Sequence, residues 1–230
     1  MCLLVESSDG LVLVDTGLGT QDYIKAPGIL WTFKLVTIVP LDPEEAAIRQ
    51  IAGLGYQPED VRHIVLTHMH FDHAGALPDF PWAKVHVHRR EYEAFKSGKI
   101  RRWADGGYNR HILDHGADIA LYGETKDKWY DFDAIRLPFE PEMNLLPLFG
   151  HTLGHCGVAV KDGDGWLFHV ADAASFAEDA PEWLVKFVLG PHQPRLRAFA
   201  RSHPEVRMTT GHMWLDFFDK NIPYKNPWRH

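Results

Sequence analysis

A dense group of histidines follows a short apolar run in the first third of the chain. The run at 64–66 reads Ile-Val-Leu, which is typical of a short buried strand. An extended chain places alternate residues on one side, and the turn that follows can bring one more side chain to join them. Imidazole nitrogen and carboxylate oxygen are ligands that suit zinc, iron, manganese and cobalt. The pattern therefore predicts a metal site at the end of a strand, formed by His68, His70, Asp72 and His73.

Three later segments offer the same residue types at the ends of other apolar runs. His151 lies in a glycine-flanked turn, Asp172 follows a run that ends at Ala171, and His212 follows another run. Each of them alone would be an ordinary turn or cap residue. Because loops at the carboxyl ends of strands build the binding sites of α/β proteins, we expect the three side chains to join the histidine group.

Length and composition predict a single globular domain spanning residues 1–230, of which 45% are hydrophobic. The two cysteines do not make a disulfide framework, no apolar run approaches the length of a membrane span, and the N-terminal segment lacks the basic region of a signal peptide. We therefore expect a cytoplasmic protein that does not associate with membranes. The net charge of −7 disfavours a nucleic-acid partner. The oligomeric state stays open, with a homodimer as one option.

Apolar runs and turn signals predict a mixed α/β layered fold. The Asp-Gly pairs at 9–10 and within 162–165 predict hairpin turns, and Asp-Pro-Glu-Glu at 42–45 predicts the start of a helix whose buried stripe includes Leu54. Residues 98–130 show no clear period, and we expect a surface excursion there. The other expected strands lie at 1–5, 11–14, 64–66, 85–87, 135–139, 144–149, 156–160, 166–171 and 206–210, and the other expected helices at 90–97 and 194–202.

The order of the motifs resembles the metallo-β-lactamase superfamily. His-x-His-x-Asp-His at 68–73, Gly-His-Thr-x-Gly-His at 150–155, Asp172 and then Gly-His at 211–212 follow one another as in that family, and Asp-Thr-Gly at 15–17 is similar to its N-terminal turn. The resemblance covers nearly the whole chain. It implies an αββα sandwich, in which two mixed β-sheets are flanked by helices and carry a pair of metal ions at one edge.

The resemblance also implies a role for each matching residue. Asp15 would orient a ligand histidine through the ring nitrogen that faces away from the metal. His155 would support the site without binding metal. The ligands would be His68, His70 and His151 for the first ion, Asp72, His73 and His212 for the second, and Asp172 as a bridge between both.

A site with two metal ions predicts hydrolytic chemistry. Two ions about 3.5–4 Å apart can share a hydroxide that attacks a carbonyl group. Asp72 and Asp172 are the expected catalytic carboxylates, because Asp172 would hold the pair together and Asp72 has a spare oxygen to carry a proton. Zinc is the expected metal, with iron, manganese and cobalt as alternatives.

Softer motifs resemble the N-acyl homoserine lactonase branch of the superfamily. They lie at 38–40, 43–45, 55–60, 68–75 and 90–94. They imply opening of a lactone or cleavage of a related ester, with a small-molecule substrate as the expected partner. Lactonases place a Tyr shortly after the bridging Asp, whereas residues 172–176 here read Asp-Ala-Ala-Ser-Phe. The alternatives are hydrolysis of a thioester, amide or phosphoester, an iron-using redox member of the same superfamily, and a non-catalytic binding module.

Five other histidines are interpreted as structural or surface residues. His86 and His88 alternate with two valines and are expected on the solvent side of a strand. His169 is expected in the core, and Cys156 is expected to be a buried thiol. We expect His111, His115, Arg101 and Arg102 at the surface, and core packing or loop anchoring for the aromatic residues Trp31, Phe33, Trp103, Tyr108, Trp129 and Tyr130.

Overall fold

The computed structural model of the chain describes residues 1–24, 42–98, 106–174 and 182–212. Its strands are β1 (Leu3–Ser7), β2 (Gly10–Val14), β3 (Val61–Val65), β4 (Lys84–His88), β5 (Ile119–Tyr122), β6 (Lys128–Trp129), β7 (Phe132–Asp133), β8 (Ile135–Arg136), β9 (Met143–Pro147), β10 (Cys156–Asp162), β11 (Gly165–Ala171) and β12 (Val206–Thr210). Its α-helices are α1 (Thr20–Ile24), α3 (Ala47–Gly53), α4 (Phe71–Ala74), α5 (Arg89–Ser97), α6 (Glu182–Leu189) and α7 (Gln193–Ser202).

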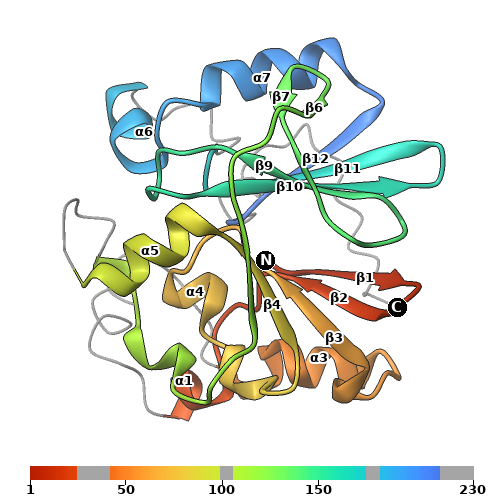
Figure 1. Cartoon of the computed structure of the whole chain (residues 1–230), viewed down its shortest axis with the longest axis vertical. Helices are drawn as coiled ribbons and strands as arrows, with labels where there is room; N and C mark the ends of the chain where they lie inside the picture. Colours follow the sequence, from red (N-terminus) through yellow and green to blue (C-terminus); the bar gives the residue numbers. More distant parts are fainter. Residues whose placement is uncertain (25–41, 99–105, 175–181, 213–230) are drawn as a thin grey trace.

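Both large sheets are mixed. In the first sheet, of order β1-β2-β3-β4-β5, the first pair is antiparallel and the other pairs are parallel. In the second sheet, of order β12-β11-β10-β9-β8, only β12 and β11 are parallel. The sheets lie face to face, with α3 and α4 outside the first sheet and α6 and α7 outside the second (Figure 1). This arrangement confirms the expected αββα sandwich.

Three apolar clusters account for the four layers. In β2, Leu11 and Leu13 belong to the cluster shared with α3, whereas Val12 and Val14 belong to the cluster between the two sheets. Because alternate residues face opposite sides and both sides are covered, the whole strand is apolar. In the second sheet, Phe168 faces the third cluster, which includes side chains of α7. A large side chain buried in such a cluster contributes roughly 1.5–3 kcal/mol.

The helix expected from residue 42 is present but divided. The Asp42 carboxylate accepts a hydrogen bond from the Glu44 amide at 3.0 Å, as a cap should, and a 3-10 turn follows at Pro43–Glu45. Ala46 is then extended, and α3 begins only at the next residue. The side chain of Leu54 is 42% exposed, so the buried stripe ends before it.

The prediction of a surface excursion at 98–130 is wrong for part of this range. Strand β5 pairs in parallel with β4 and completes the first sheet. Ile112 is buried in the cluster outside that sheet, and Tyr108 packs against it. The four residues of β5 are too few for a period of two to stand out from the polar sequence around them.

The solvent-facing positions expected for His86 and His88 are also wrong, because each side chain is only 2% exposed. Strand β4 lies inside a sheet that is covered on both faces, so alternation does not lead to solvent. His86 Nε2 lies 3.0 Å from His63 Nδ1, and His86 Nδ1 lies 2.7 Å from the Tyr122 hydroxyl. His88 Nδ1 accepts a hydrogen bond from the Arg90 amide at the start of α5.

The buried position of His86 predicts a specific pH dependence of stability. Burial, followed by the charges of His63 and Lys84, lowers the pKa of His86 to about 4 from its ordinary 6.5. As pH falls, the His86 imidazole therefore binds a proton in the unfolded chain before it does so in the folded chain. Above pH 6.5 this difference costs the folded protein no stability, and stability is lost as pH falls from 6.5 to about 4. Urea unfolding of chelator-treated protein measures this effect. Between pH 7.5 and pH 5, the unfolding free energy should fall by about 2 kcal/mol less in His86→Gln than in the unsubstituted protein. Exposed His111 gives the control variant His111→Gln, and an equal pH dependence in all three proteins would contradict the prediction.

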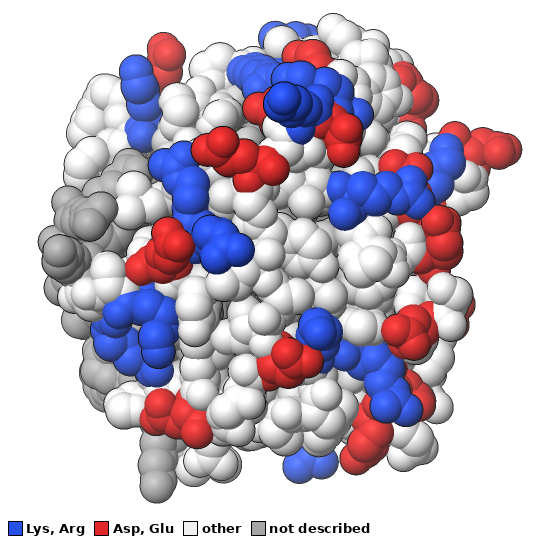
Figure 2. Space-filling view, in the orientation of Figure 1, with Lys and Arg blue, Asp and Glu red and all other residues white. Residues whose placement is uncertain are grey.

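The surface carries charges of both signs. On the face shown in Figure 2, Lys and Arg side chains are interspersed with Asp and Glu. Exposed ion pairs such as Arg207 with Asp162, at 2.6 Å, contribute only about 0–1 kcal/mol each. Among the described helices, none has the length and apolar character needed to cross a membrane.

Candidate metal centre

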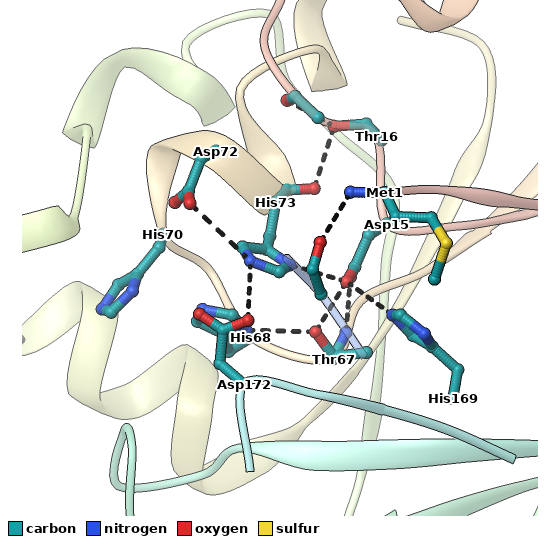
Figure 3. Close-up of polar contacts among 12 residues, drawn as sticks. Met1, Asp15, Thr16, Thr67, His68, His70, Asp72, His73, His169 and Asp172 are labelled. Atoms are coloured by element: carbon teal, nitrogen blue, oxygen red, sulfur yellow. Dashed lines mark hydrogen bonds and ion pairs between the residues drawn. The ribbon is translucent and has the colours of Figure 1, made fainter. Parts of the chain in front are cut away.

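The side chains that the sequence predicts as ligands meet at one rim of the sandwich. They come from the loops and turns that follow β3, β9, β11 and β12. Figure 3 shows His68, His70, Asp72, His73 and Asp172 among these side chains. The predicted ligands form three groups of three. Within each group, one nitrogen or oxygen atom from each side chain lies within 4.8 Å of the other two. These groups are His68 with His70 and His151, His68 with His73 and Asp172, and Asp72 with His73 and His212.

A short helix, and not an extended run, presents part of the first motif. Helix α4 begins at Phe71 with His70 as its N-cap, so Asp72 and His73 both project from its first turn. The alternation expected through Asp72 therefore stops at His70. The helix still brings both side chains to the site, because only residues 66–70 separate it from β3.

A strained backbone aims Asp172 into the site. The register between β11 and β12 shifts between His169 and Ala171, and Ala171 has a φ of 46°. Such bulges re-aim side chains and are frequent beside functional sites. Gly211 leaves the room that the carboxylate needs, because a Cβ atom there would lie 2.2 Å from Asp172 Oδ1. The Asp172 amide donates to His155 Nε2 at 3.2 Å, which is the contact that a supporting residue would make.

Two members of the three-histidine group, His68 and His151, present bare Nε2 atoms. The Thr67 hydroxyl donates to Asp15, so its oxygen accepts from His68 Nδ1 at 3.0 Å and leaves His68 Nε2 without a proton. His151 Nδ1 donates to the Val188 carbonyl at 2.8 Å, which likewise leaves its Nε2 bare. His151 Nε2 lies 3.2 Å from His70 Nδ1. Such a cluster of lone pairs is favourable around a cation.

Asp172 lies between this group and the second one. Its Oδ1 atom is 3.4 Å from His73 Nε2. Its Oδ2 atom is 3.4 Å from His151 Nε2 and 3.2 Å from His212 Nε2. Asp72 closes the second group, with Oδ2 3.3 Å from His212 Nε2. One carboxylate thus faces ligand atoms of both groups.

Asp15 fixes the ring of His73 from behind. Its Oδ2 atom accepts from His73 Nδ1 at 2.8 Å, and its two oxygens accept from the Thr67 amide and hydroxyl at 2.8 and 2.7 Å. Burial would raise the pKa of Asp15, but the charge of His73, the nearby imidazole of His169 and the hydrogen bond from His73 outweigh it and hold the pKa below its usual range. The carboxylate therefore stays ionised and keeps His73 Nε2 turned toward the site.

Among the predicted ligands, His68, His70 and Asp172 have the protonation states that metal binding needs. Burial, with the charges of His73 and His70, lowers the pKa of His68 well below its ordinary value, and burial with His151 lowers the pKa of His70 to about 3. Burial would raise the pKa of Asp172, but the charges of His212 and His73 hold it well below the usual range. At neutral pH these imidazoles are neutral and this carboxylate is ionised. Burial would lower the pKa of His73 and His212, but the neighbouring carboxylates of Asp172 and Asp72 raise the pKa of both imidazoles.

The buried ligand atoms fit a metal ion better than they fit one another. A buried polar atom left without a partner costs about 1–3 kcal/mol. Histidine nitrogen together with carboxylate oxygen suits zinc and its neighbours, so the donor set agrees with the unsatisfied atoms. Within the described part of the chain, the buried atoms of the predicted ligand residues that lack a hydrogen-bond partner are His68 Nε2, His70 Nε2, His73 Nε2 and Asp172 Oδ1.

Three residues outside the predicted ligand set, His169, Cys156 and Trp129, are buried as expected. His169 is fully buried, with Nδ1 3.1 Å from the Thr209 hydroxyl and Nε2 3.8 Å from Asp15. Cys156 is a fully buried free thiol, and burial raises its pKa well above the ordinary value. Trp129 packs in the cluster next to α7, which confirms its core role. The expectations for Trp31, Phe33, Arg101, Arg102 and Trp103, and for Ser175 and Phe176, lie outside the described residues.

The sequence interpretation missed Glu91. This acid is fully buried in the first turn of α5, where its carboxylate accepts hydrogen bonds from Met69 and Thr152, which adjoin the ligand histidines. A signal was available, because Glu91 lies three and four residues before Ala94 and Phe95, the buried residues of the same helix face. A carboxylate on an apolar helix stripe indicates either a buried partner or a site.

A layered αββα fold with histidine and carboxylate ligands at one rim defines a metal-binding class of protein. The model of the metallo-beta-lactamase superfamily matches residues 1–216. The chain belongs to this superfamily. A probable metallo-hydrolase of Mycobacterium tuberculosis is 42% identical over 175 residues, which cover 74% of this chain and 55% of that protein. The chain therefore spans little more than half the length of that relative.

Other relatives confirm the resemblance to the lactonase-like branch. The N-acyl homoserine lactonase AttM of Rhizobium radiobacter is 30% identical over 193 residues, which cover 77% of this chain and 68% of that protein. Among solved structures, a mutant of Bacillus thuringiensis AiiA with N-decanoyl-L-homoserine at its active site has a TM-score of 0.65 and 23% identity. That match covers 92% of this chain and 80% of the other, and it confirms the fold.

Proposed function

We propose that this protein is a dinuclear metal-dependent hydrolase that opens a lactone or cleaves a related ester. The observation that carries the proposal is the place of Asp172, whose two oxygens face His73 on one side and His151 and His212 on the other. A carboxylate in that position can bind two ions at once, and paired ions are used by many hydrolytic enzymes.

The two groups of side chains give each ion its own ligands. When bound, a pair of divalent ions supplies Lewis acidity toward a carbonyl oxygen and lowers the pKa of water to about 7. Zinc suits the imidazole and carboxylate donors best, and iron, manganese and cobalt are the alternatives. We assign His68, His70 and His151 to the first ion, Asp72, His73 and His212 to the second, and Asp172 to both.

Asp72 is the residue that we assign to proton transfer. Its side chain is 15% exposed, compared with 6% for Asp172, so it is the more accessible of the two carboxylates. One of its oxygens can remain on the ligand side while the other accepts a proton from water and passes it to the leaving alkoxide. Burial would raise the pKa of Asp72, but the charges of His73 and His212 hold it low, so the group begins the reaction as a base.

The choice of a lactone or ester rests on the relatives. AttM, at 30% identity, is an N-acyl homoserine lactonase, and the match covers more than two thirds of both chains. The solved relatives include one that holds the product N-hexanoyl-L-homoserine at its catalytic metal centre. Both support a small molecule with a carbonyl ester bond as the substrate class.

A substrate panel on protein of defined metal content tests the proposal. We expect about two zinc ions per chain, the highest kcat/KM on a lactone or ester, and a loss of more than about 1,000-fold on chelation that added zinc restores. The panel should also include aryl esters, thioesters, amides and phosphodiesters. Highest turnover on one of the last three would contradict the lactone assignment alone. Coloured, iron-containing protein that hydrolyses none of these substrates would contradict the hydrolase.

A further inference from the structure

Glu91 is a buried acid next to the candidate metal centre that the proposed chemistry does not use. Its side chain is fully buried in the first turn of α5. Burial of an acid without partners is costly, so an acid kept in such a place needs donors around it. The arrangement of those donors shows what the carboxylate connects.

The carboxylate accepts hydrogen bonds from four separate donors. Oε1 accepts from the Met69 amide at 2.9 Å and from the Tyr108 hydroxyl at 3.0 Å. Oε2 accepts from the Thr152 hydroxyl at 2.6 Å and from the Gly154 amide at 3.0 Å. Two donors on each oxygen use the full accepting capacity of an ionised carboxylate.

These donors lie on the segments that carry the three-histidine group. Met69 stands between His68 and His70, and Thr152 directly follows His151. The first segment follows β3 of one sheet, and the second connects β9 with β10 of the other sheet. Glu91 therefore joins the two halves of the first metal group across the interface between the sheets.

Close backbone packing shows that the joint is tight. A Cβ atom on Gly154 would lie 2.1 Å from the Glu91 amide nitrogen, so the loop rests directly against the helix. A Cβ atom on Gly107 would lie 2.8 Å from the His70 ring, and the ring of Tyr108 packs edge-on against His70 with centroids 5.2 Å apart. Movement of the carboxylate would therefore be passed on to the ligand histidines.

We propose that Glu91 is a positioning residue that sets the separation of His70 and His151, and through it the affinity of the first metal site. This inference rests on the proposed function, because it requires the three histidines to bind metal. It assigns Glu91 to the first site only, because His73 in the second group is held by Asp15 instead. Partners of this kind change metal affinity by about 10–100-fold when they are removed.

Zinc titration of four proteins in competition with a chromophoric chelator tests the proposal. In Glu91→Gln, an NH2 group replaces one of the two carboxylate oxygens. This group cannot accept hydrogen bonds, so the two donors that face it lose their acceptor. We expect one of the two zinc dissociation constants to rise about 10–100-fold and the other to stay unchanged. Thr152→Val, which removes one donor at nearly constant volume, should raise the same constant by about 10-fold. Glu93→Gln is the matched control, because Glu93 is exposed on the same helix.

The outcomes separate positioning from general destabilisation. Unfolding of each chelator-treated variant in urea reports the structural contribution, and the zinc constants report the contribution to the site. Zinc constants that match the unsubstituted protein, or two constants that rise together, would overturn the proposal for Glu91. If Glu91→Gln does not fold, Thr152→Val decides by the same criterion. An unsubstituted protein that binds no zinc would instead overturn the proposed function itself.

Discussion

Protein carrying Asp172→Ala should fold, retain no tightly bound zinc and turn over its substrate more than about 1,000-fold more slowly than the unsubstituted protein. The reason is geometric, because the two carboxylate oxygens of Asp172 approach nitrogens of both ligand groups within 3.2–3.4 Å. Without them each group keeps only three side chains, and nothing offsets the repulsion between two cations. Zinc per chain, measured by elemental analysis, and the rate on the best substrate of the panel give the two readouts.

The exposed acid Asp164, in the turn between β10 and β11, provides the control for Asp172. Asp164→Ala removes the same group from the same part of the chain and should keep both zinc and turnover. Cooperative thermal unfolding of each variant shows that any loss is local to the site. Full activity in Asp172→Ala would refute the bridging assignment.

The second large effect concerns the stability of the metal-free protein. Asp15→Ala should lower the unfolding free energy by about 3–5 kcal/mol, because it breaks a buried pair and leaves the Thr67 amide and His73 Nδ1 without an acceptor. Asp15 also has a φ of 54°, a conformation that alanine adopts less readily than aspartate does. Urea unfolding of chelator-treated protein at neutral pH measures the difference.

Two further variants show whether the effect belongs to the buried contacts. Asp15→Asn keeps one accepting oxygen and tolerates the positive φ, so it should lose less than alanine does. Asp9→Ala removes an acid whose side chain is 80% exposed beside His63, and it should change the free energy by less than about 1 kcal/mol. A loss below 1 kcal/mol in Asp15→Ala would show that the carboxylate does not hold His73 in place.

The sequence predicts a common group for the ligand side chains because they come shortly after apolar runs. Asp172 and His212 lie one and two residues beyond the strands that carry them, so local patterning was sufficient to place them at a common rim. The αββα layers were predicted from the resemblance. In the structure, strands such as β2 pack against a neighbouring layer on each face.

The features that were missed depend on contacts distant in the sequence. His86 and His88 alternate with valines as a half-exposed strand would, and only the second sheet and the neighbouring side chains bury them. Helix α6 has a sequence, Glu-Trp-Leu-Val-Lys-Phe-Val-Leu, that suits a strand as well as a helix. Glu91 binds partners up to 63 residues away, so no local pattern could reveal what it joins.

The same long-range contacts separate the speed of folding from the lifetime of the folded state. His73 meets Asp15 across 58 residues and His70 meets His151 across 81 residues, so the ligand groups assemble only after distant strands have paired. Chains dominated by such non-local contacts cross their folding barrier slowly. An ion that binds only the assembled rim stabilises contacts formed after that barrier, and such contacts slow unfolding without accelerating folding. A metal ion bound at this rim would thus extend the lifetime of the native state without speeding its formation.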